Sequence, residues 1–461
     1  MVIKKSKIQL NEDFDWELHP DLDAFVNSKI NYFLSKNPLA KHLSELMYQK
    51  TSTKFIDWID HIVIPSRSIK PKELEQLGLC VRTSKDTHKN TIIYEHKRSY
   101  LFPILVSTNN IYEIALKPES IDDFMQYLSM GNMIEGVAFS EYRYVKLTKG
   151  KYILSAVERR GYNGFVVKDT SDILAYQKAL SLLYTRRRHF DSDKQGIVYT
   201  IKLINSLKRI LPIARIADAF FRSERAYWQK KNRAGQMQKS RQDSLGLGWG
   251  NHDHHTYRSS RENFSSMIKI FELMGYYCRE RYYAGESAGW GAQILEHDIC
   301  NIVVFTDVDL KPSETQIDFA HKGLKEKNNK LGTVGLWVGL HGESILQAGM
   351  HHLEARFDFD KLKKDILDYG VEVMPPFSYF DFLKQAFTVG DHWQVEKSRI
   401  DYLLKQKFIT MEQHTQFLNN GAIGSHMENL ERGAGFKGFN KSSITKIIMA
   451  TDPRKNHKSG A

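Results

Sequence analysis

Cysteine is scarce in this 461-residue chain, and long apolar runs are missing from it. The three cysteines, Cys80, Cys278 and Cys300, lie far apart and form no C-x-x-C pair, which argues against a disulfide framework and a cysteine-based zinc site. No stretch of about 18 apolar residues occurs, so no membrane-spanning helix is expected. The N-terminal residues lack the apolar core of a secretory signal. These absences predict a cytoplasmic protein.

The overall composition is that of a globular protein. Hydrophobic residues make up 41%, charged residues 26% and aromatic residues 12% of the chain. Such a composition excludes a collagen, a mucin or a disordered tail protein. The length predicts two or three domains, each able to bury a core of its own.

The positive charge is concentrated in one segment. The whole chain has 66 basic and 54 acidic residues, and the segment 186–241 alone has 15 basic and 4 acidic ones. Apolar residues recur there at helical spacing, and Pro212 predicts a kink or a break into two helices. We favour a solvated connector between two domains. Contact with RNA or with acidic lipid through this segment is the alternative, and we expect neither nucleic acid nor membrane as a partner.

The two sides of this segment resemble diverged copies of one plan. The polar stretch 229–250 is the expected domain boundary. Each copy starts with an Asp-His strand, at 55–64 and at 251–258, and continues with a helix that ends near residue 77 or 273. The copies also end alike, since Glu158-Arg-Arg-Gly161 matches Glu431-Arg-Gly433. These matches indicate an internal repeat in the chain.

Repeated strand–helix–strand–strand–strand units predict an α+β fold with open, cupped sheets. We expect tandem βαβββ units in two repeated halves that the basic helical connector joins. The expected domains are a degenerate N-terminal unit pair over residues 1–185, the connector over 186–248, and a metal-binding catalytic domain over 249–461. A homo-oligomer is left open.

Several of the 18 histidines cluster in the C-terminal half. Imidazole and carboxylate bind Fe(II), Mn(II) and Zn(II), and two histidines with one carboxylate on one face form the non-haem iron arrangement. The clusters are His252, His254 and His255; His351 and His352; and His426 with Glu428. They predict a metal site in this half.

Each candidate ligand comes with an arginine. Residues two apart on a strand point to the same side of a sheet. His254, His352 and Glu428 would therefore each share a face with the arginine four residues later, namely Arg258, Arg356 and Arg432. A metal with converging guanidinium groups suits a substrate that bears a carboxylate, because arginine binds carboxylate through two parallel hydrogen bonds.

These residues resemble the vicinal oxygen chelate superfamily, and within it the iron-dependent 2-oxo-acid dioxygenases. The segments 285–295, 349–353 and 428–440 are similar to 4-hydroxyphenylpyruvate dioxygenases. The motifs His254-His-Thr-Tyr-Arg258 and His351-His352-Leu-Glu-Ala-Arg356 resemble the His-x-x-x-Arg and Asn-His-Leu-x-x-Arg motifs of the 2-oxoadipate dioxygenase/decarboxylase (hydroxyglutarate synthase) family. The resemblance covers residues 251–443 well and the N-terminal half loosely.

The resemblance implies Fe(II) held by His254, His352 and Glu428. His255 is an alternative to His254, and the Asp-His pairing and the offset to Arg258 favour His254. In the N-terminal half, His61 is retained and Ser155 matches Glu428 by the closing motif, which implies that this half has lost its metal.

The resemblance also implies roles for the surrounding side chains. Arginines would clamp the substrate, polar groups would bind its distal end, and two phenylalanines would close over it as a lid or pack in the core. The arginines are Arg258, Arg356 and Arg432. The polar groups are Gln293, Ser287 and His426, and the phenylalanines are Phe436 and Phe439. Glu431 departs from the family pattern, and we expect it to place a negative charge near the metal.

The implied activity is that of a non-haem Fe(II) dioxygenase that oxidatively decarboxylates and hydroxylates a 2-oxo acid with O₂. Two alternatives remain open. An extradiol-type dioxygenase or a glyoxalase-like lyase or isomerase would use the same kind of metal site on the same fold. A non-enzymatic binding protein would keep only a vestigial site.

Overall fold

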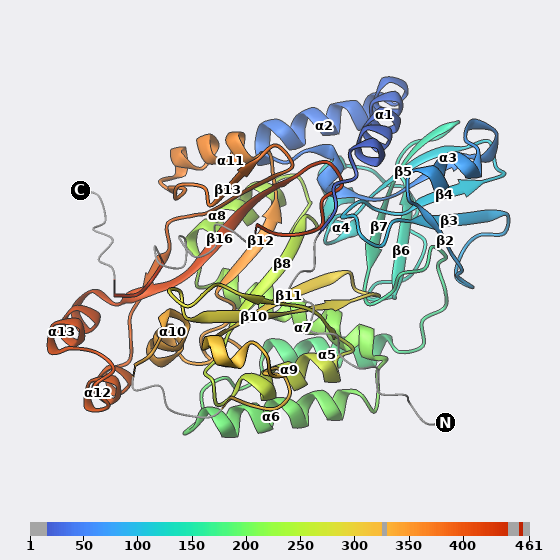
Figure 1. Ribbon diagram of the computed structural model, residues 1–461. Coiled ribbons are helices and arrows are strands. Elements are labelled where there is room, and N and C mark those ends of the chain that lie inside the picture. Colours follow the sequence, from blue (N-terminus) through green and yellow to red (C-terminus); the bar gives the residue numbers. More distant parts are fainter. Residues whose placement is uncertain (1–15, 325–329, 441–450, 455–461) are drawn as a thin grey trace.

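The computed structural model describes residues 16–324, 330–440 and 451–454. Figure 1 shows two sheets side by side with helices packed around them. Each half of the chain builds one sheet, which confirms the predicted α+β architecture with two repeated halves. Both sheets are open, with β2 and β6 at the edges of one, and β13 and β9 at the ends of the strand order in the other.

The N-terminal sheet has seven strands in the order β2-β3-β4-β1-β5-β7-β6. Helices α1 and α2 pack on it, and they are separated at Asn37, whose side chain accepts a hydrogen bond from the Ala40 amide and caps α2. The elements are α1 (Pro20–Lys36), α2 (Pro38–Thr51), η1 (Phe55–Trp58), β1 (Ile59–Pro65), η2 (Ser66–Ser68), α3 (Pro71–Gln76), β2 (Cys80–Arg82), β3 (Thr91–Glu95), β4 (Ile104–Ser107), β5 (Tyr112–Leu116), α4 (Ile121–Leu128), β6 (Tyr142–Lys146) and β7 (Tyr152–Arg159).

The C-terminal sheet has nine strands in the order β13-β14-β16-β12-β8-β11-β10-β9, and β15 pairs with β16. Its elements are β8 (His252–Arg258), α9 (Phe264–Leu273), β9 (Tyr277–Tyr283), β10 (Trp290–His297), β11 (Ile302–Asp309), η3 (Pro312–Glu314), α10 (Thr333–His341), β12 (His352–Arg356), α11 (Phe359–Asp365), η4 (Leu367–Tyr369), β13 (Ser378–Phe380), β14 (Leu383–Phe387), β15 (Asp391–Trp393), α12 (Lys397–Lys405), α13 (Met411–Asn420) and β16 (Ala422–Arg432).

The strand pairing shows the predicted repeat. The leading strands of two consecutive units lie antiparallel at the centre of each sheet, β1 with β5 and β8 with β12. Each leading strand is also parallel to the last strand of its own unit, which is β4, β7, β11 or β16. The second unit of the N-terminal half has three strands, one fewer than the first unit of either half.

The basic segment is not a solvated connector, so that interpretation is wrong. Four helices connect the two sheets along the chain and include most of this segment, and Phe220 and Phe221 pack in the same core as Tyr257 of β8 and Phe271 of α9. The predicted break into two helices is present, since α6 ends at Leu207 and Pro212 is the N-cap residue of α7. The helices are α5 (Ile173–Tyr184), α6 (Asp193–Leu207), α7 (Ile213–Gln229) and α8 (Arg233–Asp243).

Many of the charges in this segment are used inside the protein. Arg186 and Arg188 are buried and both pair with Glu224, while Arg241 pairs with Asp365. The local excess of positive charge is therefore partly neutralised by carboxylates. Among the described residues, no helix is both long and apolar enough to span a membrane.

Candidate metal centre

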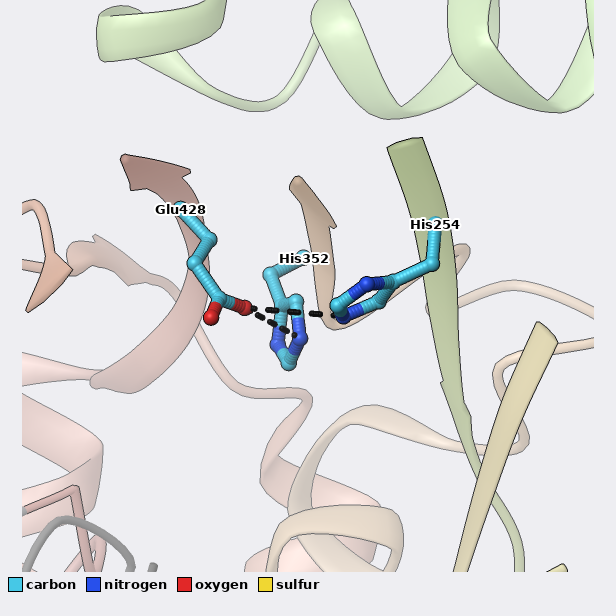
Figure 2. A group of neighbouring side chains, drawn as sticks. All are labelled: His254, His352 and Glu428. Carbon is cyan, nitrogen blue, oxygen red and sulfur yellow. Dashed lines mark ion pairs between the residues drawn. The ribbon is translucent and has the colours of Figure 1, made fainter. Parts of the chain in front are cut away.

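Three side chains from three adjacent strands meet on one face of the C-terminal sheet (Figure 2). They are His254 on β8, His352 on β12 and Glu428 on β16, all buried, and one ligand atom of each lies within 4.8 Å of the others. Oε2 of Glu428 lies 3.0 Å from Nε2 of His352 and 3.8 Å from Nε2 of His254. Donor atoms bound to one metal at about 2.1 Å are separated by roughly 3–3.5 Å, so small shifts bring all three to a common ion.

The alternation of side chains along β8 selects the first ligand. His255 faces the opposite side, where its ring packs 4.8 Å from that of Phe221 and its Nε2 lies 3.4 Å from a guanidinium nitrogen of Arg225. His254 faces the other two candidates, as the Asp-His pattern predicts. Its Nδ1 contacts the carboxylate of Glu354, which leaves Nε2 to bind a cation.

A second buried carboxylate lies beside the first. Gln385 of β14 donates one hydrogen bond to Oε1 of Glu354 at 2.9 Å and another to Oε1 of Glu428 at 3.2 Å. The alternation along β12 places Glu354 on the face of His352, so the sequence contained a signal for it. It contained none for Gln385, which enters the site from a strand without any motif.

The electrostatics of these carboxyl groups fit a bound cation. Burial raises the pKa of Glu428 to about 8, and it raises the pKa of Glu354 well above its usual range, where the charge of Glu428 adds to the effect. Within the described part of the chain, neither carboxylate forms an ion pair with a lysine or arginine. Burial also lowers the pKa of His352, which keeps its ring neutral and able to bind metal. The donor set and its missing counter-charge therefore fit a divalent metal.

Arg258 is buried near this site with unused donors. Its guanidinium lies over the ring of Trp337 in α10, and its Nε is 3.7 Å from Oδ2 of Asp307. Within the described residues, Nε and Nη1 have no hydrogen-bond partner. Burial lowers the pKa of Arg258 to about 10 and raises that of Asp307 to about 7. A buried guanidinium with free donors is suited to bind an anion. Asp307 was not predicted from the sequence.

The other two predicted arginines lie elsewhere. Arg356 is at the boundary with the N-terminal half, with Nε 3.9 Å from Asp253 and the guanidinium over the ring of Tyr100. Arg432 donates to Asp253 and to the carbonyl oxygens of Phe436 and Gly438. These contacts engage the guanidinium of Arg432, so the structure gives it a positioning role in place of the predicted contact with substrate.

Gln293 and Ser287 do not reach the site. Gln293 lies on β10 between Ala292 and Ile294, whose side chains belong to the apolar cluster beside the metal ligands. Because side chains alternate, Gln293 points away from that cluster, and its amide donates to the carbonyl oxygen of Glu280. Ser287 is exposed in the turn between β9 and β10. The roles predicted for these two residues are therefore wrong.

The remaining predicted residues divide between the site and the core. His426 is in register with His352, and its Nδ1 lies 2.8 Å from the carbonyl oxygen of Thr388. Phe439 packs 5.1 Å from the ring of Phe305, which itself lies 4.4 Å from the ring of His254. Phe439 therefore covers the ligands on one side.

Phe436 packs in a different cluster, with its ring 5.0 Å from that of Phe382, so the core-packing alternative holds for it. Glu431 is not near the metal ligands by its contacts. Its carboxylate pairs with Lys54 and accepts a hydrogen bond from the Phe359 amide. The expected negative charge from Glu431 beside the metal is wrong, because Glu431 alternates with Glu428 across the sheet.

The N-terminal sheet shows what stands at the equivalent positions. In the C-terminal half, Thr256, two residues after His254, pairs with His352 on the antiparallel neighbouring strand. In the N-terminal half, Val63, two residues after His61, pairs with Glu113, so Glu113 is the equivalent of His352. Glu113 accepts hydrogen bonds from Ser155 at 2.6 Å and from Tyr144 at 2.9 Å. His61 is thus the only imidazole at these three positions. That this half has lost its metal stays a prediction.

Comparisons with known proteins give only similarities of fold. No family model and no curated protein matches this sequence. Among solved structures, a variant of 4-hydroxymandelate synthase from Streptomyces coelicolor is 12% identical, with a TM-score of 0.28, and the match covers 87% of this chain and 98% of that one. A putative hydrolase from Shewanella frigidimarina is 16% identical (TM-score 0.32; 48% and 95% covered). Methylmalonyl-CoA epimerase from Mycobacterium tuberculosis is 10% identical (TM-score 0.23; 40% and 89% covered). With scores this low, the function has to be inferred from the site itself.

Proposed function

We propose that the protein is a non-haem Fe(II) dioxygenase that oxidatively decarboxylates a 2-oxo acid and hydroxylates the remainder of the same molecule with O₂. The observation that carries this proposal is the buried His254–His352–Glu428 group with the anion-binding Arg258 nearby. Two histidines and one carboxylate on one face are typical of non-haem iron, and they leave coordination positions for O₂ and a chelating substrate.

The internal repeat supports open coordination positions. His426 of β16 is in register with His352, and Glu428 lies two residues after His426. In the other unit, Val303 of β11 is in register with His254, and the residue two positions after Val303 is Phe305. A phenyl ring cannot bind a metal, and this one packs against the ring of His254. The symmetric place for a fourth strand-borne ligand is therefore apolar.

The protein groups around the ligands have separate roles. Arg258 would bind the substrate carboxylate, and Asp307 would orient the guanidinium. Phe305, Phe387 and Phe439 would exclude water from one side of the site. When bound, Fe(II) would supply the O₂ chemistry, while the chain positions the substrate and keeps the cavity dry.

Oxygen consumption tests this proposal. The Fe(II)-reconstituted protein is screened in an oxygen electrode with aromatic and aliphatic 2-oxo acids, and released CO₂ is measured in parallel. We expect O₂ uptake only with an added 2-oxo acid, with one CO₂ released per O₂ consumed. Uptake that does not depend on any 2-oxo acid, or uptake without CO₂, would contradict the proposal.

Glu354 favours a second candidate, a glyoxalase-like lyase or isomerase. Its carboxylate contacts His254 and has a raised pKa, as a general base near a metal often has. Such an enzyme would work without O₂. Turnover of a substrate under strictly anaerobic conditions would favour it over the dioxygenase.

The variant Phe305→His separates the two candidates further. It adds an imidazole at the symmetric fourth position. A dioxygenase with this substitution would keep its iron and lose O₂ uptake, because an open position is filled. A lyase or isomerase, which needs no site for O₂, would keep measurable activity.

A further inference from the structure

A second group of side chains that could hold a metal ion lies at the β9 end of the C-terminal sheet. It consists of Glu272 in the last turn of α9, Cys278 on β9 and His321 in the segment after η3. One ligand atom of each lies within 4.8 Å of the others. No sequence motif reveals this group, because no two cysteines are close and the three residues are up to 49 positions apart.

The imidazole of His321 is held in an orientation suited to metal binding. Its Nδ1 lies 2.9 Å from both carboxylate oxygens of Asp318, and its Nε2 lies 2.8 Å from Oε1 of Glu272. A carboxylate that accepts the Nδ1 hydrogen leaves Nε2 as the donor to a metal, which is the usual arrangement around metal-bound histidine.

The segment that carries His321 is anchored by the residues directly before it. Phe319 and Ala320 are buried in the main core. Arg281 of β9 donates to the carbonyl oxygen of Ile317 at 2.9 Å and pairs with Asp318 at 2.7 Å. The position of His321 relative to β9 is therefore determined by these contacts and does not depend on a metal ion.

We propose that Glu272, Cys278 and His321 form a zinc site, separate from the iron site, that ties the segment after η3 to the end of α9 and to β9. A thiolate, an imidazole and a carboxylate are ligands that zinc takes together. Ligand atoms around one tetrahedral zinc are about 3.5 Å apart, which the three side chains reach by small rotations. A solvent molecule completes the coordination, because Glu272 and His321 are partly exposed.

The charges around Cys278 are consistent with this assignment. Burial, together with the nearby carboxylates of Glu272 and Asp318, raises the pKa of its thiol to about 12. The thiol therefore keeps its proton at neutral pH unless a metal ion replaces it. Without metal, His321 would simply bridge two carboxylates as a cation.

Cobalt binding tests the proposal without interference from the iron site. The full-length protein is titrated with Co(II), and the thiolate-to-cobalt charge-transfer absorption in the near ultraviolet is recorded. The His254–His352–Glu428 group contains no sulfur, so this absorption reports on cobalt bound to a cysteine and not on the iron site. We expect the band in the wild type, in Glu428→Ala and in the matched control Cys80→Ser, whose cysteine is exposed on the other sheet.

The variants Cys278→Ser and His321→Gln complete the experiment. We expect Cys278→Ser to lose the band, and both variants to bind one zinc ion per chain fewer than the wild type at equal iron content. A wild type without the band, or equal zinc content in the wild type and both variants, would overturn the zinc site. Neither result would affect the proposed iron site, which is measured by iron content alone.

Discussion

Arg432 donates hydrogen bonds to both carboxylate oxygens of Asp253, at 3.3 and 3.0 Å, and Asp253 directly precedes His254. The same pair occurs in the N-terminal half, where Arg159 binds both oxygens of Asp60, directly before His61, at 2.7 and 2.8 Å. Each arginine also donates to carbonyl oxygens of the segment that follows its strand. The repeated halves thus share a structural ion pair, and in the described part of the chain only the C-terminal half has a candidate metal-binding group, His254, His352 and Glu428, beside this pair.

This relationship predicts different effects for two matched variants. Arg432→Lys and Arg159→Lys should each lower the free energy of unfolding by roughly 2–4 kcal/mol, because a lysine cannot replace a buried bidentate guanidinium. Only Arg432→Lys should also weaken Fe(II) binding, by about 10–100-fold, because it removes the support of a ligand-bearing strand. Chemical unfolding and Fe(II) titration measure the two effects. An equal loss of iron affinity in both variants would contradict this account.

Arg258 and Arg356 can be compared as substrate clamps. Arg258→Met should raise KM for the 2-oxo acid by about 10–100-fold, because a charged hydrogen bond contributes about 1.5–3 kcal/mol. Arg356→Met should raise KM much less, since its guanidinium lies near Asp253 and Tyr100. Steady-state kinetics at saturating O₂ measure both values. The double variant Arg258→Met/Asp307→Asn controls for misfolding. It removes the buried carboxylate of Asp307 together with the guanidinium beside it, so that no unpaired buried charge is left. An unchanged KM in the double variant would rule out Arg258 as the clamp.

The ionisation of Asp307 should make the stability depend on pH. Its pKa is raised to about 7 by burial, so the folded state binds a proton more tightly than the unfolded state. Stability is then highest below the unfolded pKa of about 4 and falls as the pH rises to about 7. Asp307→Asn removes this dependence. Its free energy of unfolding relative to wild type should increase by about 2–3 kcal/mol between pH 5 and pH 8. Urea unfolding at both values measures it, and a difference that does not change with pH would contradict the shifted pKa.

The sequence indicated His254, His352 and Glu428 as candidate ligands because they lie on strands, where side chains alternate regularly. The Asp-His pattern and the arginine four residues later favoured His254 over His255, and the structure places His254, not His255, beside His352 and Glu428. That these side chains bind a metal stays a prediction. The family resemblance failed at Gln293, which it placed in the site, whereas the alternation along β10 turns this side chain away from it. Its neighbours Ala292 and Ile294 take the inward positions on β10.

Contacts between distant strands and helices were beyond sequence analysis. The bridge from Gln385 to both carboxylates depends on β14 lying next to β16, which no motif reveals. The basic segment 186–241 was misinterpreted because its charge was counted without the carboxylates that fold against it. Asp365, which pairs with Arg241, is 124 residues away from it in the sequence.

The most direct test of the account is the iron content of the protein after anaerobic reconstitution with Fe(II). Wild type is compared with His352→Ala, Glu428→Ala and Ser155→Ala, the last being the matched control at the equivalent position of the other half. We predict one iron per chain in the wild type and in Ser155→Ala, and loss of iron in His352→Ala and Glu428→Ala. Absence of tightly bound iron in the wild type, or iron that both ligand variants retain, would contradict the metal centre.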